Sequence, residues 1–387
     1  MKVFHLSHTD LDGYGCQFIA KEFFSDMTFY NANYGKEVMV RLNSILDSLS
    51  HLPSSANESA QELLMKKFGT KPRQSTQSMS QSQNLPKPKY LILVTDLNLT
   101  LSEANMLNDR VSELKINGYD VELLLLDHHI SGQECADRYG WYHLDSARCA
   151  SRITFEYLSE HYPLLDVQRK EWIDKLSLMI NSVDIWLEDG YKFDFGKVAM
   201  GLISSSFELN RFMFDEEHRL YKFALIEAAR DYLDSENGEV SFDNALYSIK
   251  KRALGGDPAT QTMDTITSNA QVRLLSQKKE LCTIYYGEKK GFLSYSMGGI
   301  SVLANLFLKE NPEYDFYLDV NPKGNISLRA NGNCDVSALS RELFNGGGHK
   351  NASGGKIDGF RESFAYADIK RQIEYILGQQ ELGDSEY

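Results

Sequence analysis

The sequence predicts an α/β protein with a mainly parallel sheet in its N-terminal part. Three apolar runs lead to this prediction, KVFHLSH (2–8), YLILVTDL (90–97) and VELLLLDHH (121–129). Short apolar runs bounded by polar residues are typical of strands buried on both faces of a parallel sheet. Each run also carries aspartate or histidine at its end. Because open parallel sheets bind ligands at the carboxyl ends of their strands, we expect a site there.

A helix and an insertion follow the first strand. The stretch GYGCQFIAKEFF (13–24) has the apolar spacing of a helix. Residues 54–89 include ESAQELLMKKFG, which allows a short helix, followed by a segment rich in Ser, Gln and Pro. That composition buries too little apolar surface to offset the cost of ordering. We interpret 54–89 as a mobile surface insertion, with a regulatory or partner-binding segment as the alternative.

The C-terminal part of the sequence predicts a helical connector followed by a second, smaller α/β domain. The segments RLYKFALIEAARDYLD and ALYSIKKRALG are helical in pattern. The expected division is a catalytic domain at 1–188, a connector at 189–280 and a second domain at 281–387. In the last part we expect strands at 289–297, 314–322 and 324–331 and helices at 300–310 and 336–344, the second with Asp335 as its N-cap.

Composition limits the class of protein. The 387 residues exceed the roughly 250–300 at which a single core stops growing, so two domains are expected. No apolar run reaches the roughly 18 residues of a membrane span, and the N-terminus lacks the features of a signal peptide. Five scattered cysteines without C-x-x-C spacing indicate free thiols in a reducing, cytoplasmic environment. A net charge of −13 disfavours binding of long DNA or RNA but leaves room for a small phosphate ligand.

Potential metal ligands gather at the ends of the predicted strands. Carboxylate oxygens and imidazole nitrogens suit a divalent cation such as Mn²⁺, and the lack of thiolates argues against structural zinc. Any one of these aspartates has a simpler explanation as a helix cap or turn residue. Together, so many acids in one apolar crevice would repel each other without a cation. The candidates are His8, Asp10, Asp12, Asp96, Asp127, His128, His129 and Asp184.

These motifs resemble those of the DHH phosphoesterases, which are named for the triplet seen here as Asp127-His128-His129. SHTDLDG (7–13), VTDLN (94–98), LLDHH (125–129) and NSVDIW (181–186) look like the four metal-binding motifs of that family. ISLRAN followed by GGGHKNASGG looks like its substrate-binding domain, called DHHA1. The layout is most similar to the short-oligoribonucleotide hydrolases known as nano-RNases. The insertion and the long connector depart from that pattern.

The resemblance implies roles for individual residues. His8 and Asp10 would bind one metal ion, Asp12, His128 and Asp184 a second, and Asp96 would bridge the two. Asp127 would orient His128, and His129 would face the scissile phosphate. For His129, a purely structural hydrogen bond is the alternative.

Further residues would contact the substrate from the second domain. Arg329 and His349 would donate to phosphate oxygens, and Asn305 matches a substrate-contacting position. Gly346, Gly347 and Gly348 would allow close backbone approach. Without the resemblance, Arg329 would be an ordinary surface arginine and Asn305 an exposed polar residue.

The expected function is that of a phosphodiesterase with two divalent ions, preferably Mn²⁺, that trims very short RNA to mononucleotides. Hydrolysis of a cyclic or linear dinucleotide, or of a 3′,5′-bisphosphorylated nucleotide, is the alternative within the same chemistry. A non-catalytic nucleotide sensor is the alternative from another class. Monomer and homodimer fit the sequence equally well.

Overall fold

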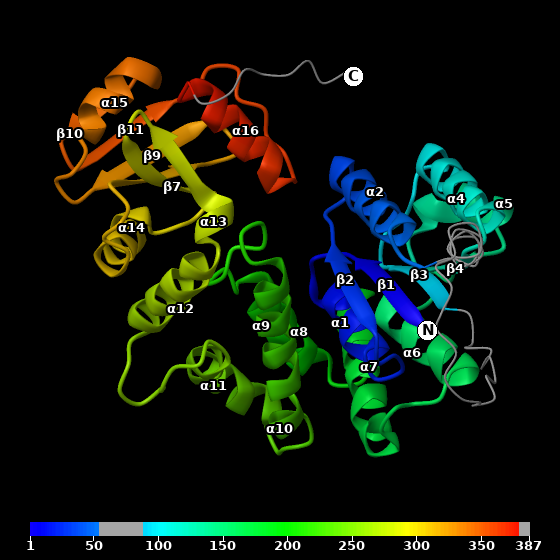
Figure 1. Ribbon diagram of the computed structural model, residues 1–387. Helices are drawn as coiled ribbons and strands as arrows, with labels where there is room; N and C mark the ends of the chain where they lie inside the picture. The colour runs from blue at the N-terminus through cyan, green and yellow to red at the C-terminus, as the bar shows by residue number, and fades with distance from the viewer. Residues whose placement is uncertain (54–87, 379–387) are drawn as a thin grey trace, which may run out of the picture. The chain divides into compact units, whose positions relative to one another are not determined.

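The computed structural model describes residues 1–53 and 88–378 (Figure 1). The chain packs as two compact units, residues 1–204 with 230–240 and residues 205–229 with 241–387. The division at 188 and 280 stays a prediction. The insertion predicted at 54–89 lies outside the described residues, except for its last two positions.

The first unit contains a five-stranded sheet in which every strand is parallel to its neighbours. This confirms the predicted fold class. The three apolar runs form its centre, and two shorter strands that the pattern did not reveal form its edges. In spatial order the strands are β2 (Met27–Asn31), β1 (Lys2–Ser7), β3 (Lys89–Thr95), β4 (Asp120–Asp127) and β5 (Tyr142–Leu144).

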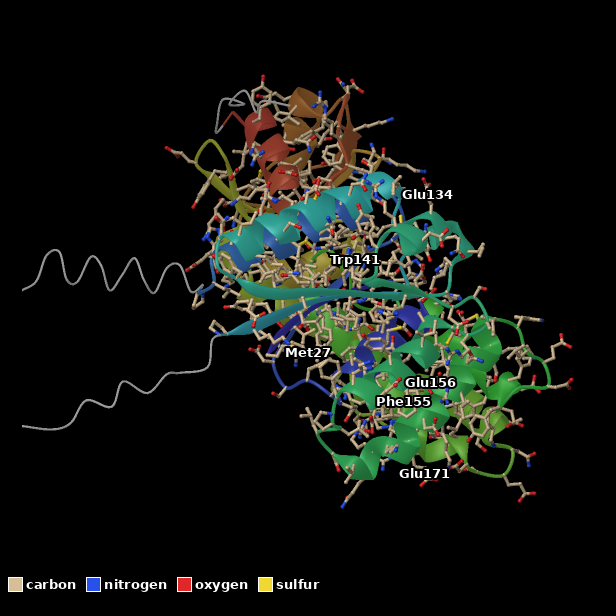
Figure 2. The ribbon with its side chains drawn as sticks, turned by 90° about the vertical axis from the view of Figure 1, so that its right-hand side faces the viewer. Met27, Glu134, Trp141, Phe155, Glu156 and Glu171 are labelled. Atoms are coloured by element: carbon tan, nitrogen blue, oxygen red, sulfur yellow. The ribbon has the colours of Figure 1, made fainter. Side chains whose placement is uncertain are left out.

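Helices cover both faces of this sheet, which lies between them in Figure 2. The helices α2 (Lys36–Ser50) and α4 (Leu101–Ile116) pack on one face, and their apolar side chains form a core with β1, β3 and β4. On the other face, α1 (Leu11–Ala20) and α6 (Ala150–His161) pack on the sheet and on α7 (Lys170–Asp184). Burial on both faces explains why the central strands are continuously apolar.

Further helical elements complete the first unit. They are η1 (Ile130–Gly132), α5 (Gln133–Arg138), η2 (Val167–Arg169), α8 (Phe193–Ser204) and α10 (Arg230–Leu233).

The second unit contains a six-stranded mixed sheet in the order β10-β11-β9-β8-β7-β6. Its strands are β6 (Thr283–Tyr286), β7 (Lys289–Tyr295), β8 (Phe316–Val320), β9 (Asn325–Ala330), β10 (Gly347–His349) and β11 (Ala352–Lys356). Its helices are α9 (Asp215–Ala228), α11 (Gly238–Ala253, whose first residues belong to the first unit), α12 (Met263–Gln277), α13 (Lys279–Cys282), α14 (Ile300–Glu310), α15 (Val336–Leu343) and α16 (Tyr366–Ile376). The predicted strands and helices of this part are confirmed, and Asp335 caps α15 as expected.

The glycine-rich stretch after α15 pairs as the hairpin β10–β11. A Cβ at position 346 would lie 2.0 Å from the carbonyl oxygen of Gly354. The glycine there lets two backbones approach each other, as glycine in strands commonly does. Close approach of this backbone to a substrate stays a prediction.

All five cysteines are free, as predicted, and all five are buried. None of the helices in the described ranges is long and apolar enough to cross a membrane.

Candidate metal centre

The junction of β1 and α1 positions three of the predicted ligands. His8 follows the strand, and Asp10 caps the helix by accepting a hydrogen bond from the N–H of Gly13 at 2.9 Å. Asp12 lies in the first turn of the helix. A Cβ at Gly13 would lie 2.5 Å from the carbonyl oxygen of His8. The glycine therefore allows the helix to start directly against the end of the strand.

The carboxylate of Asp12 is fixed by the N-terminus of α6. Its two oxygens accept hydrogen bonds from the backbone N–H groups of Ala150 and Ser151, each at 2.8 Å. The partial positive charge of a helix N-terminus stabilises such a carboxylate. Burial nevertheless raises the pKa of Asp12, because too little solvent reaches its charge.

Asp96 lies between the other ligands, directly after β3. It adopts a left-handed backbone conformation with φ of 54°, which aspartate tolerates better than most residues. Only 1% of its surface is exposed. Its Oδ1 is 3.4 Å from Nε2 of His128, and its Oδ2 is 3.9 Å from Nδ1 of His8. Asp96 therefore lies where a ligand shared by two ions would stand.

His128 faces three carboxylates. Besides its approach to Asp96, its Nε2 lies 3.6 Å from Oδ2 of Asp184 and 3.9 Å from Oδ2 of Asp12. Asp184 is the last residue of α7, so a helix end supplies the fourth motif. On the opposite side of Asp96, Nδ1 of His8 is 2.8 Å from Oδ2 of Asp10.

The charges of this cluster are not balanced by the protein itself. Burial, together with the charges of Asp12 and Asp10, raises the pKa of Asp96 far above its usual range and that of Asp184 to about 9. Burial also raises the pKa of Asp10, but the hydrogen bond and charge of His8 outweigh it and lower the value to about 2. Within the described residues, Oδ2 of Asp96 and Oδ2 of Asp184 are buried and receive no hydrogen bond. Such a set of donors fits divalent cations.

The ligand atoms fall into three groups whose members lie within 4.8 Å of one another. Asp96 belongs to two of them. Cys149, a residue outside the four predicted motifs, joins Asp12 and Asp184 from the N-cap of α6. The groups are His8, Asp10 and Asp96; Asp96, His128 and His129; and Asp12, Cys149 and Asp184.

A hydrogen-bonded chain adjoins the cluster. Nδ1 of His129 is 2.7 Å from Oδ1 of Asp127, and Tyr142 donates its hydroxyl to the other oxygen at 2.9 Å. The observed partner of Asp127 is thus His129, where the resemblance had implied His128. The reason is the extended backbone, which directs side chains two residues apart to the same side. Burial lowers the pKa of His129, but the hydrogen bond and charge of Asp127 outweigh it and raise the pKa.

Tyr34 extends this chain and was missed in the sequence. Its hydroxyl is 2.9 Å from Nε2 of His129, and its ring centroid is 4.6 Å from that of His8. Tyr34 follows the unpredicted strand β2 and precedes Gly35, which has a φ of 87°. An aromatic residue next to a turn glycine is too common a pattern to have singled it out.

The remaining predicted residues lie in the second unit. Arg329 on β9 donates to the hydroxyl of Ser301 on α14 at 2.8 Å. Ala352 on β11 pairs with both Arg329 and His349, so these two side chains occupy one line across the sheet. Asn305 is exposed on α14, one turn after Ser301. Substrate binding by these residues and by the three glycines stays a prediction.

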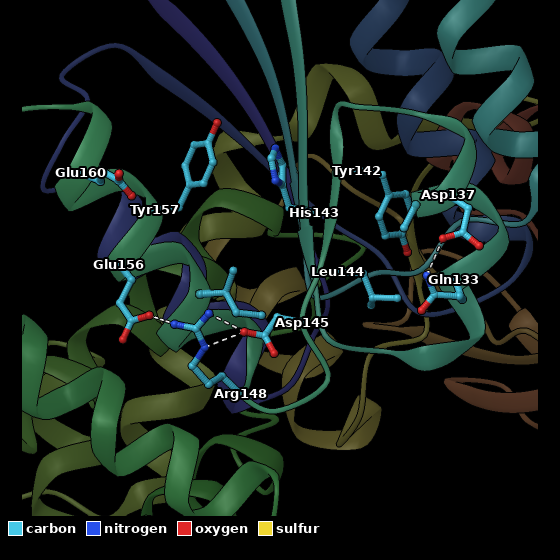
Figure 3. Close-up of a pocket in the computed structure, with 12 residues that line it drawn as sticks. Gln133, Asp137, Tyr142, His143, Leu144, Asp145, Arg148, Glu156, Tyr157 and Glu160 are labelled. Carbon is cyan, nitrogen blue, oxygen red and sulfur yellow. Dashed lines mark hydrogen bonds and ion pairs between the residues drawn. The ribbon is translucent and has the colours of Figure 1, made fainter.

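A cavity of about 530 Å³ lies beside β5, between α5 and α6 (Figure 3). Of the residues discussed above, Tyr142 lines it; no predicted metal ligand does. Two of its acidic residues, Asp145 and Glu156, are paired with Arg148. The cavity therefore lies next to the centre without supplying any of its ligand atoms.

Known proteins resemble this chain over nearly its full length. A 3′,5′-cyclic-nucleotide phosphodiesterase from Helicobacter pylori is 54% identical over 377 residues, which cover 97% of this chain and 99% of that protein. The crystal structure of an uncharacterized protein from Helicobacter pylori G27 is also 54% identical, with a TM-score of 0.85 over 98% of this chain and 99% of that one.

Other comparisons contribute less. No protein-family model matches the chain. RecJ from Thermus thermophilus in complex with Mn²⁺ is 14% identical, covering 98% of this chain and 52% of that one, with a TM-score of 0.30, which is too low to support a conclusion. The expectation of a hydrolase is confirmed by the phosphodiesterase from Helicobacter pylori. Because the two sequences are 54% identical over nearly their full length, this protein, with its Asp127-His128-His129 triplet, belongs to the same phosphodiesterase family as that enzyme.

Proposed function

We propose that the protein is a two-metal phosphodiesterase that hydrolyses 3′,5′-cyclic nucleotides. The observation that carries the metal requirement is the buried carboxylate of Asp96, which lies between two groups of ligands and has an oxygen without a hydrogen-bond donor among the described residues. The substrate class is taken from the name of the Helicobacter pylori relative.

The residues of the first unit divide into two sets around Asp96. His8 and Asp10 would hold one ion, and Asp12, His128 and Asp184 the second. When bound, two divalent ions, which we propose to be Mn²⁺, supply an activated water and neutralise charge on the phosphate. His129, held between Asp127 and the hydroxyl of Tyr34, would face the scissile phosphate and place a positive charge beside it when protonated.

Short oligoribonucleotides are the second candidate substrate. They are favoured by the similarity of the four metal motifs and the GGGH segment to those of nano-RNases. Dinucleotides and 3′,5′-bisphosphorylated nucleotides would use the same centre. The difference between these substrates lies in what surrounds the phosphate, not in the ligands of the metal ions.

A cleavage assay tests the proposal. Purified protein with Mn²⁺, Mg²⁺ or EDTA is offered 3′,5′-cyclic AMP, cyclic di-AMP, an RNA dinucleotide, a longer RNA and adenosine 3′,5′-bisphosphate. We expect metal-dependent conversion of cyclic AMP with the highest kcat/KM. Faster cleavage of the RNA dinucleotide would reassign the substrate to short RNA. Nucleotide binding without cleavage of any compound would indicate the sensor.

Asp96→Asn is the matching variant. Removing the shared carboxylate should lower kcat by more than the roughly 100-fold that loss of an outer-shell partner costs at a metal site. Asp120→Asn is the control, because Asp120 is exposed at the opposite, amino end of β4 and should leave kcat unchanged. Wild-type activity in Asp96→Asn would refute the proposed centre.

A further inference from the structure

Trp186 stands in an unusual place next to the metal centre. The helix α7 ends at Asp184, Ile185 caps it, and Trp186 follows. Two residues span at most about 7 Å of extended chain, so the backbone of Trp186 lies within that distance of the backbone of Asp184, a proposed metal ligand. Trp186 is also the last residue of the NSVDIW motif and has no role in the metal chemistry.

The backbone of Trp186 is strained. Its φ of 57° lies in the left-handed region, which is unfavourable for a bulky side chain. Leu187 donates its N–H to the carbonyl of Ser182 at 2.7 Å, which closes the helix in the manner of a Schellman motif. The position that Trp186 occupies in this motif, directly before Leu187, is most often glycine in other proteins. A tryptophan there loses stability that a glycine would keep, which invites a functional explanation.

Burial of the tryptophan ring does not explain why a strained backbone is kept at this position. The side chain of Trp186 is 60% exposed. Its ring meets that of the buried Phe193 edge-on, with centroids 5.2 Å apart and an interplanar angle of 87°. Its indole N–H donates to Oε1 of Glu188 at 3.2 Å. The ring is therefore held in place, while more than half of its surface meets solvent.

We propose that Trp186 is the platform on which the base of the nucleotide stacks while its phosphate lies at the metal centre. This inference rests on the proposed function and deepens it, since it makes the base a specificity determinant. Every base has a π-face, so an exposed indole binds bases by stacking with little preference among them. Tyr34, whose ring lies at the metal centre, already packs on the ring of His8 and has its hydroxyl engaged with His129.

Two variants separate stacking from a structural role. Trp186→Gly removes the ring and the backbone strain, so we expect an unchanged or higher Tm together with a KM for cyclic AMP raised about 5- to 150-fold, the ratio that corresponds to loss of one base stack. Trp186→Phe retains a ring and should keep KM within about fivefold of wild type. Leu187→Ala removes the neighbouring exposed side chain and serves as the control.

An abasic substrate tests whether the base is the partner. For the abasic ribose 3′,5′-cyclic phosphate, wild type and Trp186→Gly should have equal KM values, because nothing remains to stack. If Trp186→Gly raises KM equally for both substrates, or lowers Tm while raising KM, the platform is refuted.

Fluorescence distinguishes this inference from the proposed function. AMP should quench the emission of the wild type and of Trp141→Phe, but not that of Trp186→Phe. If wild type cleaves no phosphodiester, the proposed function fails, while quenching by AMP still supports the platform. An emission that does not respond to AMP, with a dimer that Trp186→Gly dissociates, would overturn the platform and assign the ring to a protein interface.

Discussion

Two aspartates at the metal centre, Asp96 and Asp184, lie in surroundings that disfavour their ionised form. Asp96 is buried, adopts a left-handed backbone conformation and lies close to two imidazoles. Asp184 has a pKa raised to about 9, first by burial and then by the charges of Asp12 and Asp10. A cation between these groups would remove the repulsion, so the arrangement suits a bound ion better than it suits the stability of the metal-free protein.

Tyr34 provides a prediction at this scale. Tyr34→Phe removes the hydroxyl at Nε2 of His129 but keeps the ring against His8. A typical hydrogen bond contributes about 0.5–1.5 kcal/mol, so kcat should fall roughly 2- to 12-fold with KM unchanged. Steady-state kinetics with cyclic AMP measure the effect. Tyr247→Phe, at a 72% exposed residue of the second unit, is the control, and a change in KM alone would contradict a role at His129.

At the scale of elements, the start of α1 decides where three ligands lie. Strand and helix are joined so closely that His8, Asp10 and Asp12 share one edge of the sheet. The N-terminus of α6 then fixes Asp12 through two backbone N–H groups. These contacts link the first motif of the chain to a helix about 140 residues later.

Gly13→Ala tests this junction. The added Cβ would lie 2.5 Å from a backbone oxygen of His8, so helix and strand must move apart. Overpacking of this kind costs about 1–3 kcal/mol. We therefore expect a lower Tm and weaker Mn²⁺ binding by calorimetry.

The matched control is Gly201→Ala in α8, where an added Cβ meets nothing within 4 Å. Replacing glycine by alanine inside a helix stabilises it by about 0.5–1 kcal/mol, so here Tm should rise. Equal effects of the two substitutions would show that the junction tolerates a side chain.

At the scale of the whole molecule, the net charge of −13 does not prevent binding of an anionic nucleotide, provided that cations lie at the site. All proposed metal ligands belong to the first compact unit. Metal binding should therefore stabilise that unit by mass action, because the unfolded chain lacks the assembled site.

The pH dependence of this stabilisation follows from Asp184. Its pKa of about 9 in the metal-free fold lies above the unfolded value of about 3.9, so the metal-free protein loses stability as pH rises between these values. A cation must displace the proton, and it binds more tightly at higher pH.

Thermal unfolding with and without MnCl₂ measures the effect. The rise in Tm caused by Mn²⁺ should be larger at about pH 8.5 than at about pH 6.5. An equal rise at both values would show that binding of the ion releases no proton from Asp184, and would contradict its place as a ligand.

The sequence by itself determined the central strands and the residues that end them. Apolar runs must be buried on both faces, and parallel strands must present their carboxyl ends at one edge, so His8, Asp96 and His128 were predictable as neighbours. The cap at Asp335 was predictable because it depends on local hydrogen bonds alone.

Only the tertiary structure decided which side chains meet at that edge. Tyr34, Cys149 and Trp186 come from a turn, a helix cap and a strained helix end, and none has a periodic pattern that marks it. Pairing of Asp127 with His129 depends on the local course of the backbone. Contacts between residues distant in sequence depend on packing. Apolar periodicity predicts which face of a helix or strand is buried, but not which residues that face contacts.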